Sequence, residues 1–193
     1  GEYPEQVYTS SPSTFLTGIA DVQTGKGFSC ALRTSGSVHC WGNDYAPYGA
    51  LGDGTTAGTA SSVKCNAADV TDGTGPLTGV AAIATAYAHS CALKNDGTVW
   101  AWGDNAHGQL GDGTRTLRTT PVQVLDATLQ PMSGIIAVQA GSDHSVALKS
   151  DGTVYAWGYN GDGQVGDGTY VDRLRPVLVV GPDTASAVDA NNW

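Results

Sequence analysis

Four cysteines are the residues of this sequence most able to form covalent cross-links, and two of them flank a tight turn. The turn signal is Thr34-Ser35-Gly36, with a short alternating apolar run on each side. If these three residues form the loop of a β-hairpin, counting outward along both strands places Cys30 directly opposite Cys40. Side chains that face each other in this way lie close to disulfide reach, so we predict a Cys30–Cys40 bond.

The remaining cysteines, Cys65 and Cys91, have a different setting. In the second hairpin the residue opposite Cys91 is Ala101, so Cys91 cannot form the same cross-strand bond. Cys65 lies in the connecting segment before that hairpin, and we predict a Cys65–Cys91 disulfide. Because disulfides persist in oxidising compartments, we expect a secreted protein, extracellular or at the cell surface. The alternative is four buried free thiols in a reducing compartment.

Histidines could supply a general base or a metal ligand, but their placement indicates a structural role. His89 and His144 occupy the same place in two similar units, and the third unit has Phe28 there. A catalytic or metal-binding role would not easily tolerate phenylalanine, so we interpret both as buried histidines bonded to neighbouring backbone. No Cys-x-x-Cys or His-x-x-x-His spacing indicates zinc.

Aspartates in three Gly-Asp-Gly-Thr segments, at positions 53, 112 and 167, could supply oxygen ligands for calcium. A calcium-binding loop needs glycine at its sixth position and glutamate at its twelfth. In the loop of residues 160–171 both of these positions hold valine. We therefore interpret the aspartates as turn formers that bond their own backbone, and we expect no metal and no cofactor.

Composition argues against several other kinds of chemistry. The chain lacks a Gly-x-Ser-x-Gly nucleophile elbow and a Gly-x-x-x-x-Gly-Lys phosphate loop, and its only glutamates are Glu2 and Glu5, so we expect no enzyme. The formal net charge is −9 and the basic residues are scattered, which disfavours nucleic acids and anionic membranes as partners. No apolar run approaches the ~18 residues that span a bilayer, so we expect no membrane insertion.

These side chains must be positioned by a unit that occurs three times. Two short strands are joined by a turn such as Asn95-Asp96-Gly97, the second strand ends in Trp-Gly, and a Gly-Asp-Gly-Thr turn follows. The tryptophans are Trp41, Trp102 and Trp157, and their repetition with the glycines indicates a packing role. Self-similarity at this period is typical of repeat architectures.

Alignment of the second and third units decides how one ambiguous segment folds. Residues 79–125 align without a gap on residues 134–180 and are identical at more than half of the positions. The Ala-rich segment Val80–Asp96 could be a helix by propensity alone, but its counterpart Ile135–Asp151 is richer in Val and Ile. We therefore predict strands in both. Glycine-rich turns and a low charged fraction of 14% also favour an all-β fold.

The repeated pattern Ala-Leu-x-x-x-Gly-x-Val-x-x-Trp-Gly, followed by Gly-x-[Leu/Val]-Gly-Asp-Gly-Thr, resembles the regulator of chromosome condensation repeat. The resemblance covers about residues 4 to 190 and implies a β-propeller with blades of four antiparallel strands. That family typically has seven blades, whereas about three repeats here imply an incomplete ring, in a secreted, bacterial-type variant. Nucleotide exchange on a small GTPase is not expected of such an arc, nor is ultraviolet-B perception, because the Gly-Trp-Arg-His-Thr motif is absent.

The chain is then a single repeat domain that is out of register with whole repeats. Pro4–Val7 matches the outer strand at Pro121–Val124, and Ser186–Ala190 resembles the start of another inner strand. We divide the chain into the end of a preceding blade with a connector, three repeats, and the start of a next strand within the last one. The boundaries are 1–25, 26–78, 79–133 and 134–193.

We expect the open blade edges to make this chain self-assemble as a structural or surface element. Other copies would complete its terminal strands through main-chain hydrogen bonds, giving a homo-oligomer or a filament. The alternative is an extracellular binding module that recognises a protein or a glycan through the loops after each Trp-Gly, which lie on one face. The candidate contact residues are Tyr45, Tyr48, His107 and Tyr159. Alternatively, these aromatic side chains lie exposed on turns without binding a ligand, or contact the next blade.

Overall fold

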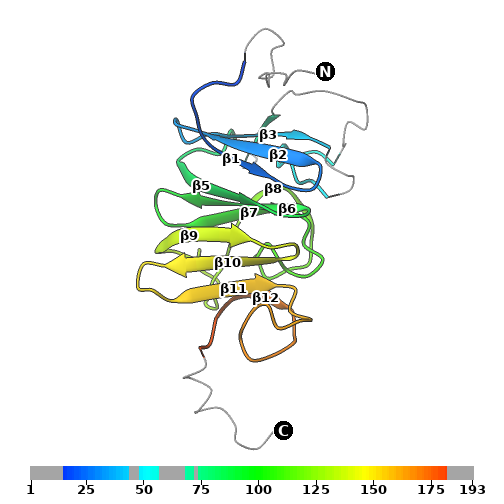
Figure 1. Ribbon diagram of the computed structural model, residues 1–193, viewed down its shortest axis with the longest axis vertical. Coiled ribbons are helices and arrows are strands. Elements are labelled where there is room, and N and C mark those ends of the chain that lie inside the picture. The colour runs from blue at the N-terminus through cyan, green and yellow to red at the C-terminus, as the bar shows by residue number, and fades with distance from the viewer. Residues whose placement is uncertain (1–14, 44–47, 57–67, 72–73, 182–193) are drawn as a thin grey trace, which may run out of the picture.

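Three similar β-sheets make up the part of the chain that this computed structural model describes, residues 15–43, 48–56, 68–71 and 74–181. Within these ranges every regular element is a strand, and each sheet has four antiparallel strands in consecutive order (Figure 1). The first sheet consists of β1 (Ile19–Thr24), β2 (Phe28–Arg33), β3 (Val38–Gly42) and β4 (Ala68–Asp69). The second consists of β5 (Val80–Thr85), β6 (His89–Lys94), β7 (Val99–Gly103) and β8 (Arg118–Gln123). The third consists of β9 (Ile135–Ala140), β10 (His144–Lys149), β11 (Val154–Gly158) and β12 (Arg173–Leu178).

The sheets, which we call blades 1, 2 and 3, lie one behind the other with blades 1 and 3 at opposite ends (Figure 1). This arrangement confirms the predicted all-β class with three four-stranded blades in an open arc. The Ala-rich segment Val80–Asp96 forms β5 and β6, as its alignment with the third unit indicated. The described ranges contain no helix with the length and apolar character to cross a bilayer.

Each hairpin between the second and third strands of a blade closes with a glycine in the left-handed region. Gly36, Gly97 and Gly152 have φ values of 81°, 79° and 87°. A residue with a Cβ atom would be strained there, which explains why glycine ends all three turns. The loop length also sets the register of the hairpin, and in blade 1 it places Cys30 opposite Cys40 as predicted.

The cysteines confirm one predicted disulfide and contradict the other. Cys30 and Cys40 are bonded, with their Cα atoms 4.1 Å apart. The predicted Cys65–Cys91 bond is wrong for this structure, because Cys91 is a buried free thiol; Cys65 lies outside the described residues. Cys91 points into the boundary with blade 3, where its Sγ is 3.6 Å from the Ser145 hydroxyl. Burial raises the pKa of the Cys91 thiol to about 11, although the hydrogen bond with Ser145 opposes this.

Blade 1 begins earlier than the boundary that we drew at residue 26. Strand β1 lies inside the segment 1–25, which we assigned to a preceding blade and a connector, and it pairs with β2. The signal was present, because Ile19–Gln23 resembles Ile135–Gln139 at the start of blade 3. The predicted terminal strands at both ends of the chain lie outside the described residues.

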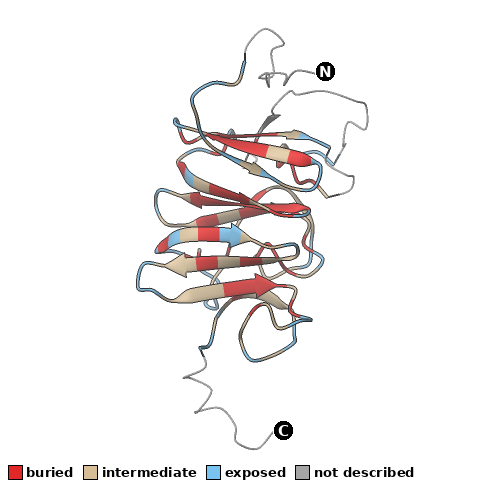
Figure 2. Cartoon of the chain, viewed as in Figure 1, coloured by how far each residue is buried: buried red, intermediate tan, exposed pale blue. Residues whose placement is uncertain are grey.

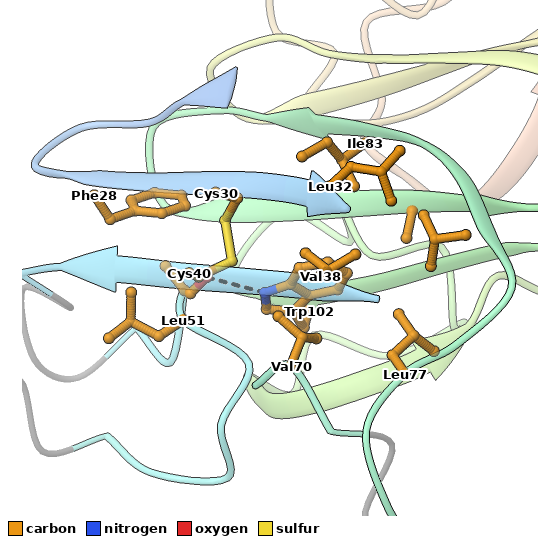
Figure 3. Packing of buried hydrophobic residues seen from close by; sticks show 13 residues of the cluster. Phe28, Cys30, Leu32, Val38, Cys40, Leu51, Val70, Leu77, Ile83 and Trp102 are labelled. Carbon is orange, nitrogen blue, oxygen red and sulfur yellow. Dashed lines mark hydrogen bonds between the residues drawn. A yellow bond between two sulfur atoms is a disulfide. The ribbon is translucent and has the colours of Figure 1, made fainter. Parts of the chain in front are cut away.

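The hydrophobic core lies between consecutive blades rather than within one. Phe28, Leu32 and Val38 of blade 1 form a cluster with Trp102, which comes from blade 2 (Figure 3). Figure 2 shows buried positions on the strands of all three blades and exposed positions mainly in the turns between strands. Each blade is therefore stabilised mainly by the blade against which it packs.

The three repeated tryptophans differ in burial according to what lies in front of them. Trp102 and Trp157 are completely buried at the boundaries between blades 1 and 2 and between blades 2 and 3, which confirms their packing role. Trp41 is only partly buried. The described residues place no blade in front of blade 1, so its tryptophan has no preceding blade to enter.

The cysteine arrangement can be checked by peptide mapping under non-reducing conditions. We expect one linked peptide pair joining Cys30 to Cys40, and Cys91 modified by an alkylating reagent. Modification of Cys91 should require unfolding, because the thiol is buried and its pKa is raised to about 11. Recovery of Cys91 in a disulfide-linked peptide would contradict the structure. Cys40→Ser frees the buried Cys30 thiol, and its labelling after unfolding is the control for complete alkylation.

Candidate functional site

The contacts between blades are repeated, and they define two faces on each blade. We call the face toward the preceding blade the leading face and the face toward the following blade the trailing face. Across the first boundary the Trp102 indole N–H donates to the Ala50 carbonyl of blade 1 at 2.9 Å. Across the second, the Trp157 indole N–H donates to the Gln109 carbonyl of blade 2, also at 2.9 Å. Each indole is thus anchored by one hydrogen bond as well as by burial.

A glycine beneath each indole allows this close approach. A Cβ atom on Gly52 would lie 2.7 Å from Trp102 Nε1, and one on Gly111 would lie 2.8 Å from Trp157 Nε1. Both glycines also have positive φ, 70° and 68°, so a side chain there would be strained as well as in collision. The need for both properties explains why each Gly-Asp-Gly-Thr segment begins with glycine.

A second close contact between glycines lies elsewhere on each boundary. Gly36 meets Gly79, and Gly97 meets Gly134; a Cβ atom on the first member of either pair would lie 3.2 Å from the amide nitrogen of the second. The carbonyls of Gly36 and Gly97 each accept a hydrogen bond from the first strand of the following blade, at 3.0 and 3.1 Å. The two boundaries therefore share one docking geometry.

Buried polar groups lie inside the boundary between blades 2 and 3. The Ser145 hydroxyl donates to the Gln109 carbonyl at 2.9 Å, so it accepts the hydrogen bond from His89 Nε2 at 3.0 Å. His89 is fully buried, and desolvation together with the charge of His144 lowers its pKa to about 3. His89 is buried as expected, but its partner is a side chain of the next blade rather than neighbouring backbone.

The trailing face of blade 3 has the same kind of surface with no described blade over it. Val146, Leu148 and Val154 are partly exposed there. Their counterparts in blades 1 and 2 are all buried: Cys30, Leu32, Val38, Cys91, Leu93 and Val99. A Cβ atom on Gly152 would meet nothing within 4 Å. One on Gly166 would meet only Val179, whereas one on Gly52 or Gly111 would collide with the indole of the next blade. A hollow of about 410 Å³ opens beside Gly166.

The leading face of blade 1 is uncovered in the complementary way. Val22 is 60% exposed, whereas Ile83 and Val138, its counterparts in blades 2 and 3, are 5% and 6% exposed. Trp41 is also partly exposed, whereas Trp102 and Trp157 are completely buried. One end of the described stack thus presents a tryptophan that packs against no described blade. The other end presents a glycine site that holds no described indole.

The Gly-Asp-Gly-Thr aspartates are turn formers, as their residue type indicated. Asp112 Oδ1 accepts hydrogen bonds from the Thr114 amide and hydroxyl at 2.9 and 2.7 Å, and its other oxygen accepts from Arg118 at 2.7 Å. Asp167 repeats both kinds of contact in blade 3. Burial raises the pKa of Asp112, but these hydrogen bonds outweigh it and hold the pKa below its ordinary value. No group of His, Cys, Asp or Glu in the described ranges is arranged to hold a metal ion.

A buried asparagine that our sequence reasoning missed organises the loop after Trp-Gly in blades 2 and 3. The Asn105 amide donates to the Thr114 and Thr116 carbonyls at 3.1 and 3.0 Å, and its oxygen accepts from the Leu110 N–H at 3.0 Å. Asn160 makes the equivalent bonds in blade 3. The signal was in the sequence, because Asn follows Trp-Gly-x in both units, but only the differences between the loops were weighed.

Two of the predicted loop contacts lie together at the boundary between blades 2 and 3. The rings of His107 and Tyr159 meet edge to face with centroids 4.8 Å apart. His107 Nδ1 lies 3.0 Å from an Asp172 oxygen, which Arg115 also contacts at 3.1 Å. Burial raises the pKa of Asp172, but hydrogen bonds from His107, the Asn160 backbone N–H and Arg115 lower it further than burial raises it. The result is a partly exposed cluster of aromatic and charged groups.

The other two predicted contacts do not join this cluster. Tyr48 is partly buried at the boundary between blades 1 and 2, where its neighbour Gly49 packs against Thr119. Tyr45 lies outside the described residues. The predicted set of four contact residues is therefore reduced to one pair that the structure brings together.

Two models of one repeat family match this chain. One model of the regulator of chromosome condensation (RCC1) repeat matches residues 96–148 and 151–191, and the other matches residues 19–46, 80–109 and 135–164. The chain belongs to the RCC1 repeat family. The second RCC1 model matches once in each blade, and each match begins at the first strand of that blade.

Curated relatives with RCC1-like sequences are much longer than this chain. The E3 ubiquitin-protein ligase HERC2 of Mus musculus is 29% identical over 194 residues, which is 97% of this chain and 4% of the ligase. The ultraviolet-B receptor UVR8 of Arabidopsis thaliana is 29% identical over 176 residues, which is 91% of this chain and 36% of the receptor. The chain thus spans far less than half of either relative.

Solved RCC1-like structures share the fold. Human WBSCR16 superposes with a TM-score of 0.65 at 24% identity, covering 85% of this chain and 42% of that protein. Prp20p of Saccharomyces cerevisiae superposes with a TM-score of 0.64 at 19% identity, covering 88% of this chain and 40% of that protein. At these identities the likeness concerns the fold of the RCC1 blades alone.

The buried histidine of this RCC1 stack predicts a loss of stability in mild acid. In the unfolded chain His89 takes up a proton near pH 6.5, whereas in the folded chain its pKa is about 3. Between these values the unfolded state binds more protons, so stability is complete above pH 6.5 and falls as the pH decreases. One such group contributes a slope of about 1.4 kcal/mol per pH unit.

Denaturant unfolding of the wild type and of His89→Phe between pH 6.5 and pH 4.5 measures this slope. The variant carries phenylalanine, which blade 1 has at the same place (Phe28). The pH dependence of its free energy of unfolding should be smaller by about one proton. His144→Phe is the matched control; its pKa is also lowered by burial, but it is only half-buried and faces Asp143, whose charge opposes the shift. Equal slopes for the wild type and His89→Phe would contradict the assignment.

Proposed function

We propose that this chain is a non-enzymatic, exported recognition element whose partners are other copies of itself, bound through the two open blade faces. One observation carries the proposal: surfaces that are buried at both internal boundaries are exposed at both ends of the described stack of blades. Val22 shows the contrast most clearly, at 60% exposed against 5% for Ile83 in blade 2. Exposed apolar faces of this kind mark interaction sites.

In the described residues, the polar side chains discussed above form contacts that hold the fold together. This supports a binding role rather than a catalytic one. The buried histidine, His89, is engaged between blades, and the aspartates of the turns bond their own loops. RCC1-repeat propellers are typically non-catalytic binding modules, and Prp20p of Saccharomyces cerevisiae binds Gsp1p and histones. For that yeast protein the partners are proteins, which supports a protein partner here.

The disulfide supports export to an oxidising compartment. Cys30 and Cys40 are fully buried beneath blade 2, in the same cluster as Trp102. Disulfides persist in secreted and extracellular proteins and are rare where thiols are kept reduced. We therefore place the proposed self-association outside the cell or at its surface, where the chain would serve as a structural or surface element.

A second candidate function rests on the loop cluster. His107, Tyr159, Arg115 and Asp172 are held by short contacts on loops that Asn105 and Asn160 anchor from below. Rigid loops with aromatic and charged tips are suited to hold a protein or glycan ligand. This function needs no second copy of the chain.

Light scattering of the intact chain under non-reducing conditions, over a range of concentrations, tests the leading proposal. We expect a mass above the 19.7 kDa of a single chain that falls toward this value on dilution. The His107→Ala variant should associate like the wild type, because the loop cluster is not part of either open face. A monomer of 19.7 kDa at every concentration would reject self-association and leave the loop cluster as the recognition site.

A further inference from the structure

We propose that a hollow between blades 2 and 3, with Tyr155 in its wall, binds one ring of a neutral sugar. The hollow has a volume of about 240 Å³ and is lined by the connector between β8 and β9 and by blade 3. Tyr155 lies near the start of β11 and Tyr159 directly follows its end, so the hollow is separate from the loop cluster. The inference goes beyond the proposed function and needs no self-association.

An apolar surface makes up part of the hollow. Met132, Tyr155 and Pro176 line it together, and Met132 and Pro176 are buried. Tyr155 is only partly buried, and it packs against the core cluster of this boundary. An aromatic ring that is fixed by packing offers a rigid, flat contact area at low cost in conformational entropy. Such a surface matches the flat C–H face of a sugar ring.

The corresponding aromatic ring at the boundary between blades 1 and 2 is covered by the chain itself. Trp100 occupies the place of Tyr155, and the Lys94 ammonium lies over its ring, 5.6 Å from the ring centre. In blade 3 the corresponding ammonium, that of Lys149, lies 3.5 Å from an Asp151 oxygen. Within the described ranges no cation lies over the Tyr155 ring, so its face is open to a ligand.

The polar part of the hollow carries one group of each charge, Asp126 and Lys149. Asp126 Oδ1 accepts hydrogen bonds from the Thr128 amide and hydroxyl at 2.8 and 2.7 Å and from the Gln130 N–H at 3.1 Å. These bonds, with that of the Thr128 hydroxyl the strongest influence, hold the pKa of Asp126 below its ordinary value, so the carboxyl is ionised at neutral pH. No donor in the described part of the chain reaches its other oxygen, which can accept from a ligand.

These two charges favour a neutral ligand. An anion would be repelled by Asp126 and Asp151, in a chain of net charge −9, and a cation would be repelled by Lys149. A hydroxyl group can donate to a carboxylate and can also accept from an ammonium. A sugar ring has several such hydroxyls around its edge and apolar C–H groups on its faces. It therefore matches both the charged and the apolar parts of this hollow.

A strained leucine lies beside the hollow. Leu129 follows Thr128, which lines the hollow, and has a φ of 67°; every other described residue with positive φ is a glycine. It ends a three-residue turn at the position that Gly97 holds in the hairpin of blade 2, and both donate their N–H to the residue before the turn. Glycine would fit there without strain, yet the leucine side chain is present and 55% exposed. Strained residues cluster at ligand sites, and Leu129 would cover the bound sugar.

Titration of the intact chain with methyl glycosides tests the site. The neutral probes are the methyl glycosides of glucose, galactose, mannose, fucose and N-acetylglucosamine; those of glucuronic acid and glucosamine are the charged counterparts. We expect at least one neutral glycoside to bind with a Kd of about 1 mM, a range that ligands of this size reach. The charged counterparts should bind at least about tenfold more weakly. Saturation-transfer NMR should give its strongest signals on the C–H protons of one ring face.

Substitutions at Tyr155 locate the bound sugar. Tyr155→Ala removes the aromatic surface and should weaken binding at least about tenfold. Tyr155→Phe keeps the ring and is the matched control, with a Kd within about threefold of the wild type. Tyr159→Ala, at the other end of β11, should leave binding unchanged. Circular dichroism and thermal unfolding establish that each variant remains folded.

Leu129→Gly separates a ligand contact from a structural role. Glycine relieves the strain of the positive φ, which offsets the greater freedom of the unfolded chain, so the variant should unfold at about the wild-type temperature. It should nevertheless bind the glycoside at least about threefold more weakly, because the covering side chain is lost. Unchanged binding by a folded Leu129→Gly would overturn the role of the leucine.

The outcomes separate this site from other occupants and from the proposed function. Failure of every neutral glycoside to bind, preference for a charged one, or binding that persists in Tyr155→Ala would overturn the proposal. Loss of binding in Tyr159→Ala would assign the sugar to the loop cluster. A neutral proline-rich peptide is titrated as the competing occupant, and its binding at Tyr155 without that of any glycoside would overturn the choice of a sugar. Light scattering measures self-association separately, so either proposal can fail alone.

Discussion

The hydrogen bond from a tryptophan indole to a backbone carbonyl of the preceding blade is the interaction on which this structure depends. It is made at 2.9 Å by both Trp102 and Trp157, and it requires a glycine of positive φ beneath the ring. Each four-stranded sheet buries little apolar surface within itself, so its stability comes from the neighbouring blade. The Trp-Gly and Gly-Asp-Gly-Thr segments recur because one supplies the indole and the other the space that receives it.

This contact gives the stack a direction, because every blade has a leading face that carries the tryptophan and a trailing face that receives it. The two ends are therefore different from each other and complementary. Within the described chain, each blade thus recognises the next by shape and by one directed hydrogen bond. The polar loops between blades form a second, independent surface, on which His107 and Tyr159 are fixed relative to each other. Under the proposed function, self-association and ligand binding would therefore respond to different substitutions.

Contacts within one hairpin could be predicted from the sequence, and contacts between blades could not. The Cys30–Cys40 bond follows from counting residues around a three-residue loop, and the strand assignment follows from aligning the units. Cys91 was paired wrongly because its environment is set by Ser145, a residue of the next blade that no hairpin register reveals. His89 also bonds to Ser145 across the blade boundary. Because hairpin register does not reveal this contact, we expected His89 to bond to neighbouring backbone. The burial of Asn105 was missed because we did not consider that asparagine follows Trp-Gly-x in both the second and the third unit.

Hydrogen exchange of the indole N–H groups, followed by NMR on tryptophan-labelled protein over a range of concentrations, tests the central claim most directly. Trp102 and Trp157 should be protected at every concentration, because their bonds lie inside the chain. The Trp41 indole should exchange freely in dilute solution and become protected to a similar degree as the chain associates. Free exchange at Trp102 or Trp157, or association that leaves Trp41 unprotected, would contradict the account.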